Sequence, residues 1–127
     1  MKNATLVWLR HSLRLRDNPA LVDAAEHGPV IPVFVSAPEE EGDWPPGGAA
    51  QWWLHHALED LDQRLRDRGS RLILRTGPTL DALRDCIDVT EADRVVWNRR
   101  YEPNLARRDA KVQAALDEQG IETQVFE

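Results

Sequence analysis

Polar side chains that could hold a flat ligand follow two separate apolar runs of the chain. Arg10 comes directly after the first run, and Asn98, Tyr101 and Glu102 come after a later one. They offer a guanidinium, an amide, an aromatic ring and a carboxylate, which can hold a planar polar heterocycle by paired hydrogen bonds and stacking. None of these side chains needs to act as an acid, a base or a nucleophile for that purpose. The set therefore indicates a binding site and not a catalytic centre.

The signatures of phosphate clamping and of common hydrolases are missing. The sequence contains no GxxxxGK[ST] loop, no GxGxxG after the first apolar run, and no HExxH or GxSxG. His55 and His56 are neighbours, and on a helix they would point about 100° apart, which is unsuited to sharing a metal ion. Cys86 stands in an apolar setting that is typical of a small core residue. We expect no catalytic residue and no metal site.

Composition and charge exclude several classes of protein. With 127 residues, 42% apolar and 30% charged, the chain has the make-up of one globular domain. Its formal net charge of −6 disfavours a free-standing nucleic-acid binder, which needs a cationic face. No apolar stretch approaches the roughly 20 residues of a membrane span, no signal-peptide core follows the start, and a single cysteine favours a reducing compartment. We expect a cytoplasmic domain without membrane contact.

Strand and helix patterns alternate along the chain. Short apolar runs predict strands at residues 6–9, 30–35, 71–75, 94–97 and 121–126. Helices are expected over residues 19–27, 49–68, 79–87 and 103–119, and the clearest of them carries Leu54, Leu58, Leu61 and Leu65 on one stripe. Pro32 predicts a bend or a partial edge in the second strand. The pattern predicts an α/β fold, an open five-stranded parallel sheet with helices on both faces in three α/β/α layers.

This fold tells us where a ligand would lie. Open parallel sheets bind ligands outside the carboxyl ends of their strands, at the point where strand order reverses. Sheets of this kind commonly place the first and fourth strands side by side there. The segments after these two strands would then face each other, flanked by the end of the second strand. The expected crevice is lined by Arg10, Ser36, Ala37, Asn98, Tyr101 and Glu102.

Each of these candidates also has a purely structural interpretation. Arg10 could pair with a carboxylate at the sheet edge. Glu102 precedes Pro103, so it could be a first-turn carboxylate favoured by the helix dipole. Asn98 and Tyr101 are residue types that are common in turns and at rims. The sequence leaves both interpretations open.

Other conspicuous residues are expected to be structural. Asn18 stands just before a helix that starts at Pro19, so capping explains it. Trp8 and Trp97 lie inside predicted strands and are expected in the core. The arginines of the long second helix alternate with aspartates and are expected on a solvated face; they are Arg64, Arg66 and Arg68.

Three stretches of the chain resemble the DNA photolyase and cryptochrome family. The first is LVWLRHSLRLRDNPAL at residues 6–21, and the second is the leucine-rich helix and following strand at residues 53–72. The third is NRRYEP at residues 98–103, followed by Arg108 and Asp109. Their order and spacing match the family, so the resemblance covers essentially the whole chain.

The resemblance implies a single Rossmann-like N-terminal domain over residues 1–127 that houses a light-harvesting antenna chromophore. Glu102 matches the family carboxylate that hydrogen-bonds the antenna ring, and Asn98 and Tyr101 lie in the same motif. Arg10 closes the first strand as a matching arginine does in the family. Ser36 and Ala37 stand where the family's second-strand loop lines the chromophore.

The resemblance also implies the chromophore and the partners. The antenna would be methenyltetrahydrofolate or a hydroxylated deazaflavin. FMN is disfavoured because Gly48–Gln51 stand where the family often has an arginine that would hold a phosphate. Ser12 likewise replaces a usual acidic residue.

FAD would belong to a larger helical domain that also contacts DNA and performs the light-driven lyase reaction of pyrimidine-dimer repair. That domain is not represented in these residues, so we expect the chain alone to be catalytically inactive. The alternatives are a cryptochrome-type photoreceptor module, or a generic small nucleotide-binding module whose likeness is only architectural.

Overall fold

A computed structural model of the chain describes residues 4–9, 18–36, 48–67, 69–100 and 102–126, the first turns of the helix at residues 48–54 by backbone alone. The strands are β1 (Thr5–Leu9), β2 (Val30–Ser36), β3 (Ile73–Thr76), β4 (Arg94–Asn98) and β5 (Glu122–Phe126). The helices are α1 (Pro19–His27), α2 (Gly48–Asp67), α3 (Thr79–Thr90) and α4 (Pro103–Glu118). The predicted alternation of strand and helix is confirmed.

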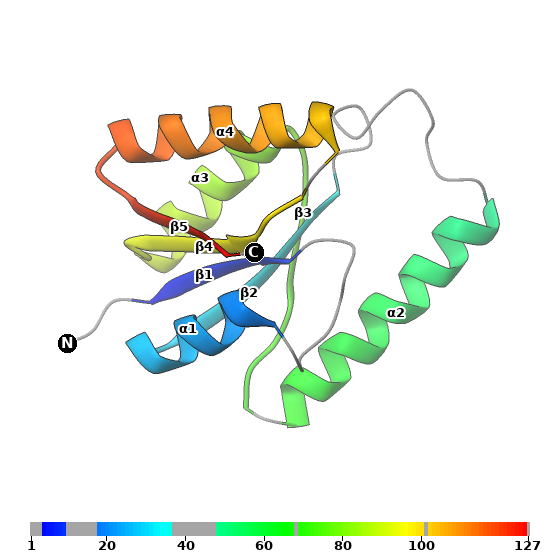
Figure 1. Ribbon diagram of the computed structural model, residues 1–127. Helices are drawn as coiled ribbons and strands as arrows, with labels where there is room; N and C mark the ends of the chain where they lie inside the picture. The colour runs from blue at the N-terminus through cyan, green and yellow to red at the C-terminus, as the bar shows by residue number, and fades with distance from the viewer. Residues whose placement is uncertain (1–3, 10–17, 37–47, 68, 101, 127) are drawn as a thin grey trace.

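All five strands are parallel and lie in the order β3-β2-β1-β4-β5. The chain builds the sheet outward from β1 to β3 and then returns to the other side of β1 with β4. Strand order therefore reverses between β1 and β4, where Trp8 stands opposite Trp97. The predicted neighbourhood of the first and fourth strands is confirmed (Figure 1).

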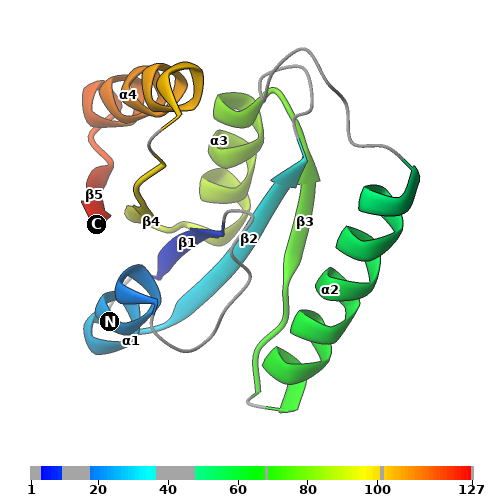
Figure 2. The same ribbon diagram turned by 45° about the vertical axis from the view of Figure 1, so that its right-hand side comes forward.

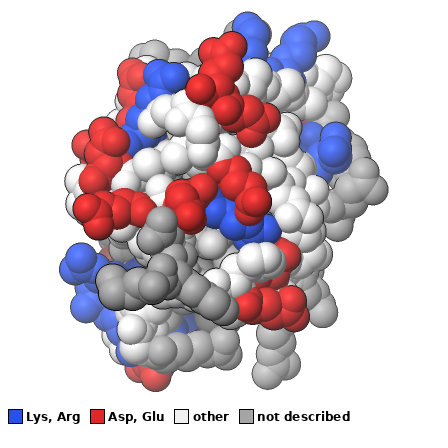
Figure 3. Space-filling model, turned by 90° about the vertical axis from the view of Figure 1, so that its left-hand side faces the viewer, with Lys and Arg blue, Asp and Glu red and all other residues white. Residues whose placement is uncertain are grey.

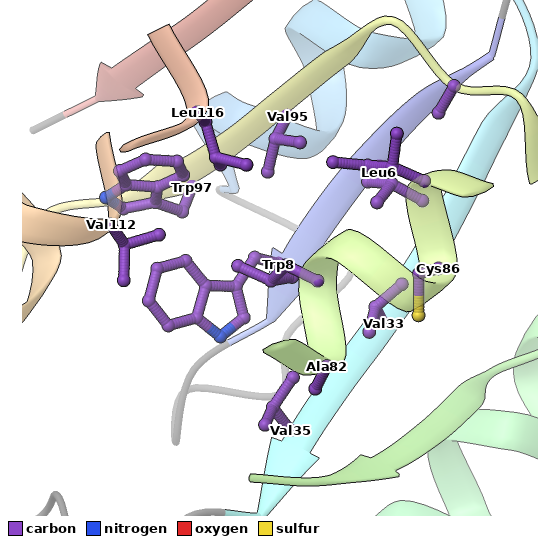
Figure 4. Packing of buried hydrophobic residues seen from close by; sticks show 13 residues of the cluster. Leu6, Trp8, Val33, Val35, Ala82, Cys86, Val95, Trp97, Val112 and Leu116 are labelled. Atoms are coloured by element: carbon purple, nitrogen blue, oxygen red, sulfur yellow. The ribbon is translucent and has the colours of Figure 1, made fainter. Parts of the chain in front are cut away.

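Helices cover both faces of the sheet, α3 and α4 on one face and α1 and α2 on the other (Figures 1 and 2). Trp8 and Trp97 point into the layer under α3 and α4, with their ring centroids 5.1 Å apart and their planes at 66° (Figure 4). Both are almost fully buried, as predicted. Cys86 lies in the same cluster, and burial raises the pKa of its thiol, as expected for a core residue.

The opposite cluster joins α1 and α2 to the sheet. Leu61 and Leu65 of the predicted leucine stripe are buried there with Val7 and Leu9 of β1. The carboxylate of Asp62 fixes the end of α2 to the following segment by accepting the Leu72 amide at 2.9 Å. This backbone hydrogen bond, with a smaller contribution from Arg66, lowers the pKa of Asp62.

Pro32 is buried in β2, which is an interior strand between β1 and β3. Pairing with β3 begins only at Val33, one residue later, while Pro32 stands opposite Val7 of β1. At Pro32 the strand thus has no registered partner on its β3 side. This is why an interior strand can include a residue that lacks an N–H.

Arg94 connects three elements at the amino ends of the strands. Its guanidinium lies 2.5 Å from Asp23 of α1 and 2.5 Å from Glu122 of β5, and it donates to Gln124 at 2.8 Å. The Arg94 side chain is 6% exposed. Figure 3 looks onto this side of the molecule, where Asp and Glu side chains are spread over the surface. The Arg94 contacts stabilise this edge of the sheet, which lies opposite the edge where a ligand is expected.

Candidate functional site

The carboxyl ends of β2 and β4 flank the end of β1. Ser36 is exposed at the end of β2, and Asn98 is the last residue of β4. Side chains alternate along a strand, so Ser36 faces away from Val33 and Val35, toward the α1 and α2 side. Asn98 points to the same side, because it contacts α1. β1 lies between the two strands, and the register places Ser36 two residues further along than Asn98, so the two residues lie on the order of 12 Å apart, comparable to the length of a fused-ring heterocycle.

Asn98 is bonded to the start of α1. Its Oδ1 accepts the backbone N–H of Ala20 at 3.2 Å, and its Nδ2 donates to Oδ1 of Asn18 at 2.7 Å. Oδ1 of Asn18 also accepts the N–H of Leu21 at 3.1 Å, which is the expected helix cap. We call this pair of side chains the Asn18–Asn98 clasp.

The clasp occupies the backbone donors at the start of α1. The first helical residue, Pro19, has no N–H; the next two amides, of Ala20 and Leu21, are taken by the clasp. The first amide to bond within the helix is that of Val22, to the carbonyl of Asn18. The start of a helix after the first strand is the usual phosphate site of open α/β sheets, because its amides are unsatisfied. Here those amides are already satisfied.

Glu102 forms a two-bond ion pair with Arg100. Nε of Arg100 donates to one carboxylate oxygen at 3.2 Å, and Nη2 donates to the other at 3.1 Å. The Glu102 side chain is 53% exposed and that of Arg100 is 23% exposed. Glu102 is also the N-cap residue of α4, but its side chain makes no capping bond. The half-exposed carboxylate is therefore held at the rim by a planar guanidinium, which fixes its direction.

The helix that follows Glu102 is anchored to the sheet beside the edge. The Arg108 guanidinium lies 5.2 Å from the centroid of the Trp8 ring and donates to Asp109 at 3.1 Å. Asp109 is buried, and Leu105 packs one turn earlier. These contacts fix the first half of α4 on the sheet, and with it the position of Glu102.

The described part of the chain thus places Ser36, Asn98 and Glu102 at one edge of the sheet. Arg10, Ala37 and Tyr101 fall outside the described residues, and their predicted role stays a prediction. The sequence interpretation missed that Asn98 and Asn18 bond to each other, and it did not single out Arg100. The two-residue spacing of Arg100 and Glu102 was a signal that could have been used.

No group of three potential ligands for a metal ion occurs among the residues that the structure describes. His55 instead bonds Glu59, one helical turn away, at 2.6 Å. In the same described part, no helix combines the length and hydropathy needed to cross a bilayer.

Comparison with known proteins identifies the family to which this chain belongs. Residues 5–127 match the family described as DNA photolyase. The chain belongs to this family. It is 46% identical to Cryptochrome-2 of Arabidopsis thaliana over 127 residues, which cover 99% of this chain and 21% of that protein.

Solved photolyases share the fold. A bacterial class III photolyase from Agrobacterium tumefaciens superposes with a TM-score of 0.91 at 43% identity, over 99% of this chain and 26% of that one. An archaeal photolyase from Sulfolobus tokodaii, described with two FAD molecules and an implied novel light-harvesting cofactor, gives 0.86 at 31% identity, over 98% and 29% of the two chains. The photolyase-family chain thus spans about a quarter of the length of these relatives.

Proposed function

We propose that this chain is the antenna-chromophore domain of a photolyase-type protein. The bound chromophore would absorb near-ultraviolet or blue light and pass the excitation through space to a flavin in the rest of the protein. The task of the chain is then to hold a pigment at a fixed position and orientation. The observation that carries the proposal is the placement of Ser36, Asn98 and Glu102 around the point where strand order reverses, in a chain that matches the family over residues 5–127.

The available side chains suit a planar ring with N–H edges. Glu102 presents carboxylate oxygens that can accept from such an edge, and Arg100 fixes their direction. The Ser36 hydroxyl, at the end of β2, can donate or accept a further hydrogen bond.

The clasp favours a chromophore without a phosphate at the start of α1. A folate carries its charge on carboxylates, and a hydroxylated deazaflavin ring is recognised by its hydrogen-bonding edges. FMN would need a phosphate clamp, and the amides of Ala20 and Leu21 are not available for one. We therefore propose methenyltetrahydrofolate or a hydroxylated deazaflavin. The same argument weighs against a generic nucleotide-binding module.

FAD, DNA and the repair reaction are proposed for the remainder of the protein. The Sulfolobus relative is described with two FAD molecules, and its matched region is less than a third of that chain. We propose that a helical FAD-binding domain is the partner of this chain. Contact with damaged DNA would take place through that domain.

Titration of the 127-residue chain with each chromophore tests the proposal. We expect saturable binding of methenyltetrahydrofolate or the deazaflavin, seen as a shifted and structured absorption band, and no binding of FMN at equal concentration. Substitution of Glu118, exposed at the far end of α4, by Ala serves as the control and leaves binding unchanged. Saturable binding of FMN or ATP with no binding of either antenna pigment would remove the antenna assignment.

A cryptochrome-type photoreceptor is the second candidate, favoured by the 46% identity to Cryptochrome-2 of Arabidopsis thaliana. The two candidates differ in the output of the remaining protein and share the antenna. Exposure of the full-length protein to light with dimer-containing DNA separates them. Loss of the dimers identifies a photolyase, and intact dimers with a light-dependent flavin signal identify a photoreceptor.

A further inference from the structure

The Asn18–Asn98 clasp joins two parts of the chain that are 80 residues apart. Asn18 ends the connection that leaves β1, and Asn98 begins the connection that leaves β4. These are the two connections expected on either side of a ligand at the reversal of strand order. The clasp therefore ties the connection that leaves β1 to the connection that leaves β4.

The contact goes beyond what helix capping requires. The cap needs only the bond from Leu21 to Asn18. Asn98 adds a second acceptor at the helix start, which takes the amide of Ala20, and its Nδ2 donates to the capping oxygen of Asn18. Asn18 is 3% exposed, so the loss of one partner would leave polar groups of the other in a desolvated place. Each asparagine thus depends on the other.

The residues that follow Asn98 also have hydrogen-bond partners. Asn98 is fixed to α1, the N–H of Arg99 donates to the carbonyl of Phe126 at 2.7 Å, and Arg100 pairs with Glu102. Asn98 is thereby tied to α1, Arg99 to β5, and Arg100 to Glu102. A carboxylate held in this way is oriented before a ligand arrives, which lowers the entropy lost on binding.

We propose that Asn18 and Asn98 are positioning residues for the chromophore site, acting as a pair to fix the stretch that carries Glu102. The inference rests on the proposed antenna function and adds residues to it. It also changes the role expected for Asn98. Asn98 was expected to contact the chromophore ring, and here it positions the residues that contact the ring. The pair acts through geometry, so neither residue needs to touch the pigment.

Variants of the 127-residue chain can distinguish three roles of Asn18 and Asn98: a positioning pair, a helix cap, and a direct contact with the pigment. Asn18→Ser keeps an oxygen that can cap Leu21 but is too short to reach Asn98. Asn98→Ala removes the other half, and the double variant completes a cycle. Thr90→Ala is the stability control, because its hydroxyl bonds the Cys86 carbonyl at 2.6 Å, at the opposite end of α3 from the site. Binding is measured by titration with methenyltetrahydrofolate and with the deazaflavin.

Each single clasp variant is expected to weaken binding about fivefold, and the double variant to be no weaker than the worse single one. Amide exchange of Arg99 without any chromophore is expected to speed up in the clasp variants and not in Thr90→Ala. A loss confined to Asn98→Ala would identify Asn98 as a ring contact and overturn the inference. Unchanged binding and exchange in Asn18→Ser would also overturn it. If the wild-type chain binds neither pigment, the antenna function fails, and the exchange rates still test whether the clasp fixes the stretch.

Discussion

At the scale of single residues, the edge of the sheet is formed by polar side chains that already have partners. Glu102 is paired with Arg100, and Asn98 is bonded to Asn18 and to the Ala20 amide. A group with a partner can still bind a ligand if acceptor positions remain, as they do on a carboxylate. It then binds from a fixed direction. Glu102 is therefore the residue we expect to contact the chromophore.

Substitution of Glu102 by Ala is expected to lower chromophore affinity about tenfold, the usual effect of losing one hydrogen bond to a charged group. The side chain is 53% exposed and fills no core volume, so the thermal midpoint is expected to stay within a few degrees of wild type. Chromophore titration and a thermal melt measure the two effects. Unchanged affinity in a folded variant would rule out the assignment of Glu102.

At the scale of elements, α2 is attached to the sheet by its second half. Leu61 and Leu65 supply the apolar contact, and Asp62 adds a hydrogen bond from the segment that leads into β3. The Leu72 amide and Arg66 hold the pKa of Asp62 below its ordinary value of 3.8. A lowered pKa means that the folded state favours the charged form. The stabilisation is complete above the ordinary pKa and is lost as pH falls through the lowered one.

Asp62→Asn is expected to flatten the acid side of the stability profile. We expect wild-type stability to fall as pH drops below the ordinary pKa of the Asp62 carboxyl and through its lowered pKa. This loss should be smaller in the variant, because asparagine keeps an acceptor for Leu72 but has no proton to bind. Urea unfolding at a series of pH values measures it. Asp67→Asn, exposed one turn later on α2, is the matched control. Parallel curves for wild type and Asp62→Asn would contradict the assignment.

A second link between elements is the Arg94 cluster at the amino ends of the strands. Arg94→Met keeps most of the volume but removes the guanidinium beside the half-buried carboxylate of Asp23. We expect a loss of about 3 kcal/mol in the free energy of unfolding. Glu122→Gln, at a side chain that is 68% exposed, is expected to cost no more than about 1 kcal/mol. Urea unfolding measures both losses. Equal losses in the two variants would show that the burial of a charged side chain does not determine what its removal costs.

At the scale of the whole molecule, the two ends of the sheet differ in their polar side chains. The amino ends carry the Arg94 cluster and an exterior on which Asp and Glu side chains are mixed with Lys and Arg (Figure 3). The carboxyl ends carry Ser36, Asn98 and Glu102. An acidic chain with a net charge of −6 has no electrostatic basis for binding a duplex by itself.

We therefore expect the 127-residue chain to show no saturable binding of a dimer-containing duplex at physiological salt, with or without chromophore. Fluorescence anisotropy of a labelled duplex measures this, and the full-length protein is the positive control. Tight binding by the chain alone, weakened by salt, would place a DNA surface on this domain.

The sequence by itself determined the elements, their order and their buried faces. Apolar runs such as Val30–Val35 are too short for helices, and the leucines at residues 58, 61 and 65 repeat with the period of a helix, so local patterns were sufficient. Strand adjacency followed from the rules for parallel sheets, and the family followed from three stretches of residues.

Only the tertiary structure decided how the polar residues at the edge are partnered. Asn18 and Asn98 are 80 positions apart, and no local pattern reports a hydrogen bond between them. The same holds for Arg94, whose partners come from α1 and β5. Hydrophobic periodicity records which face of an element is buried, whereas a hydrogen bond depends on the distance and angle between two atoms, and these exist only once the elements have packed.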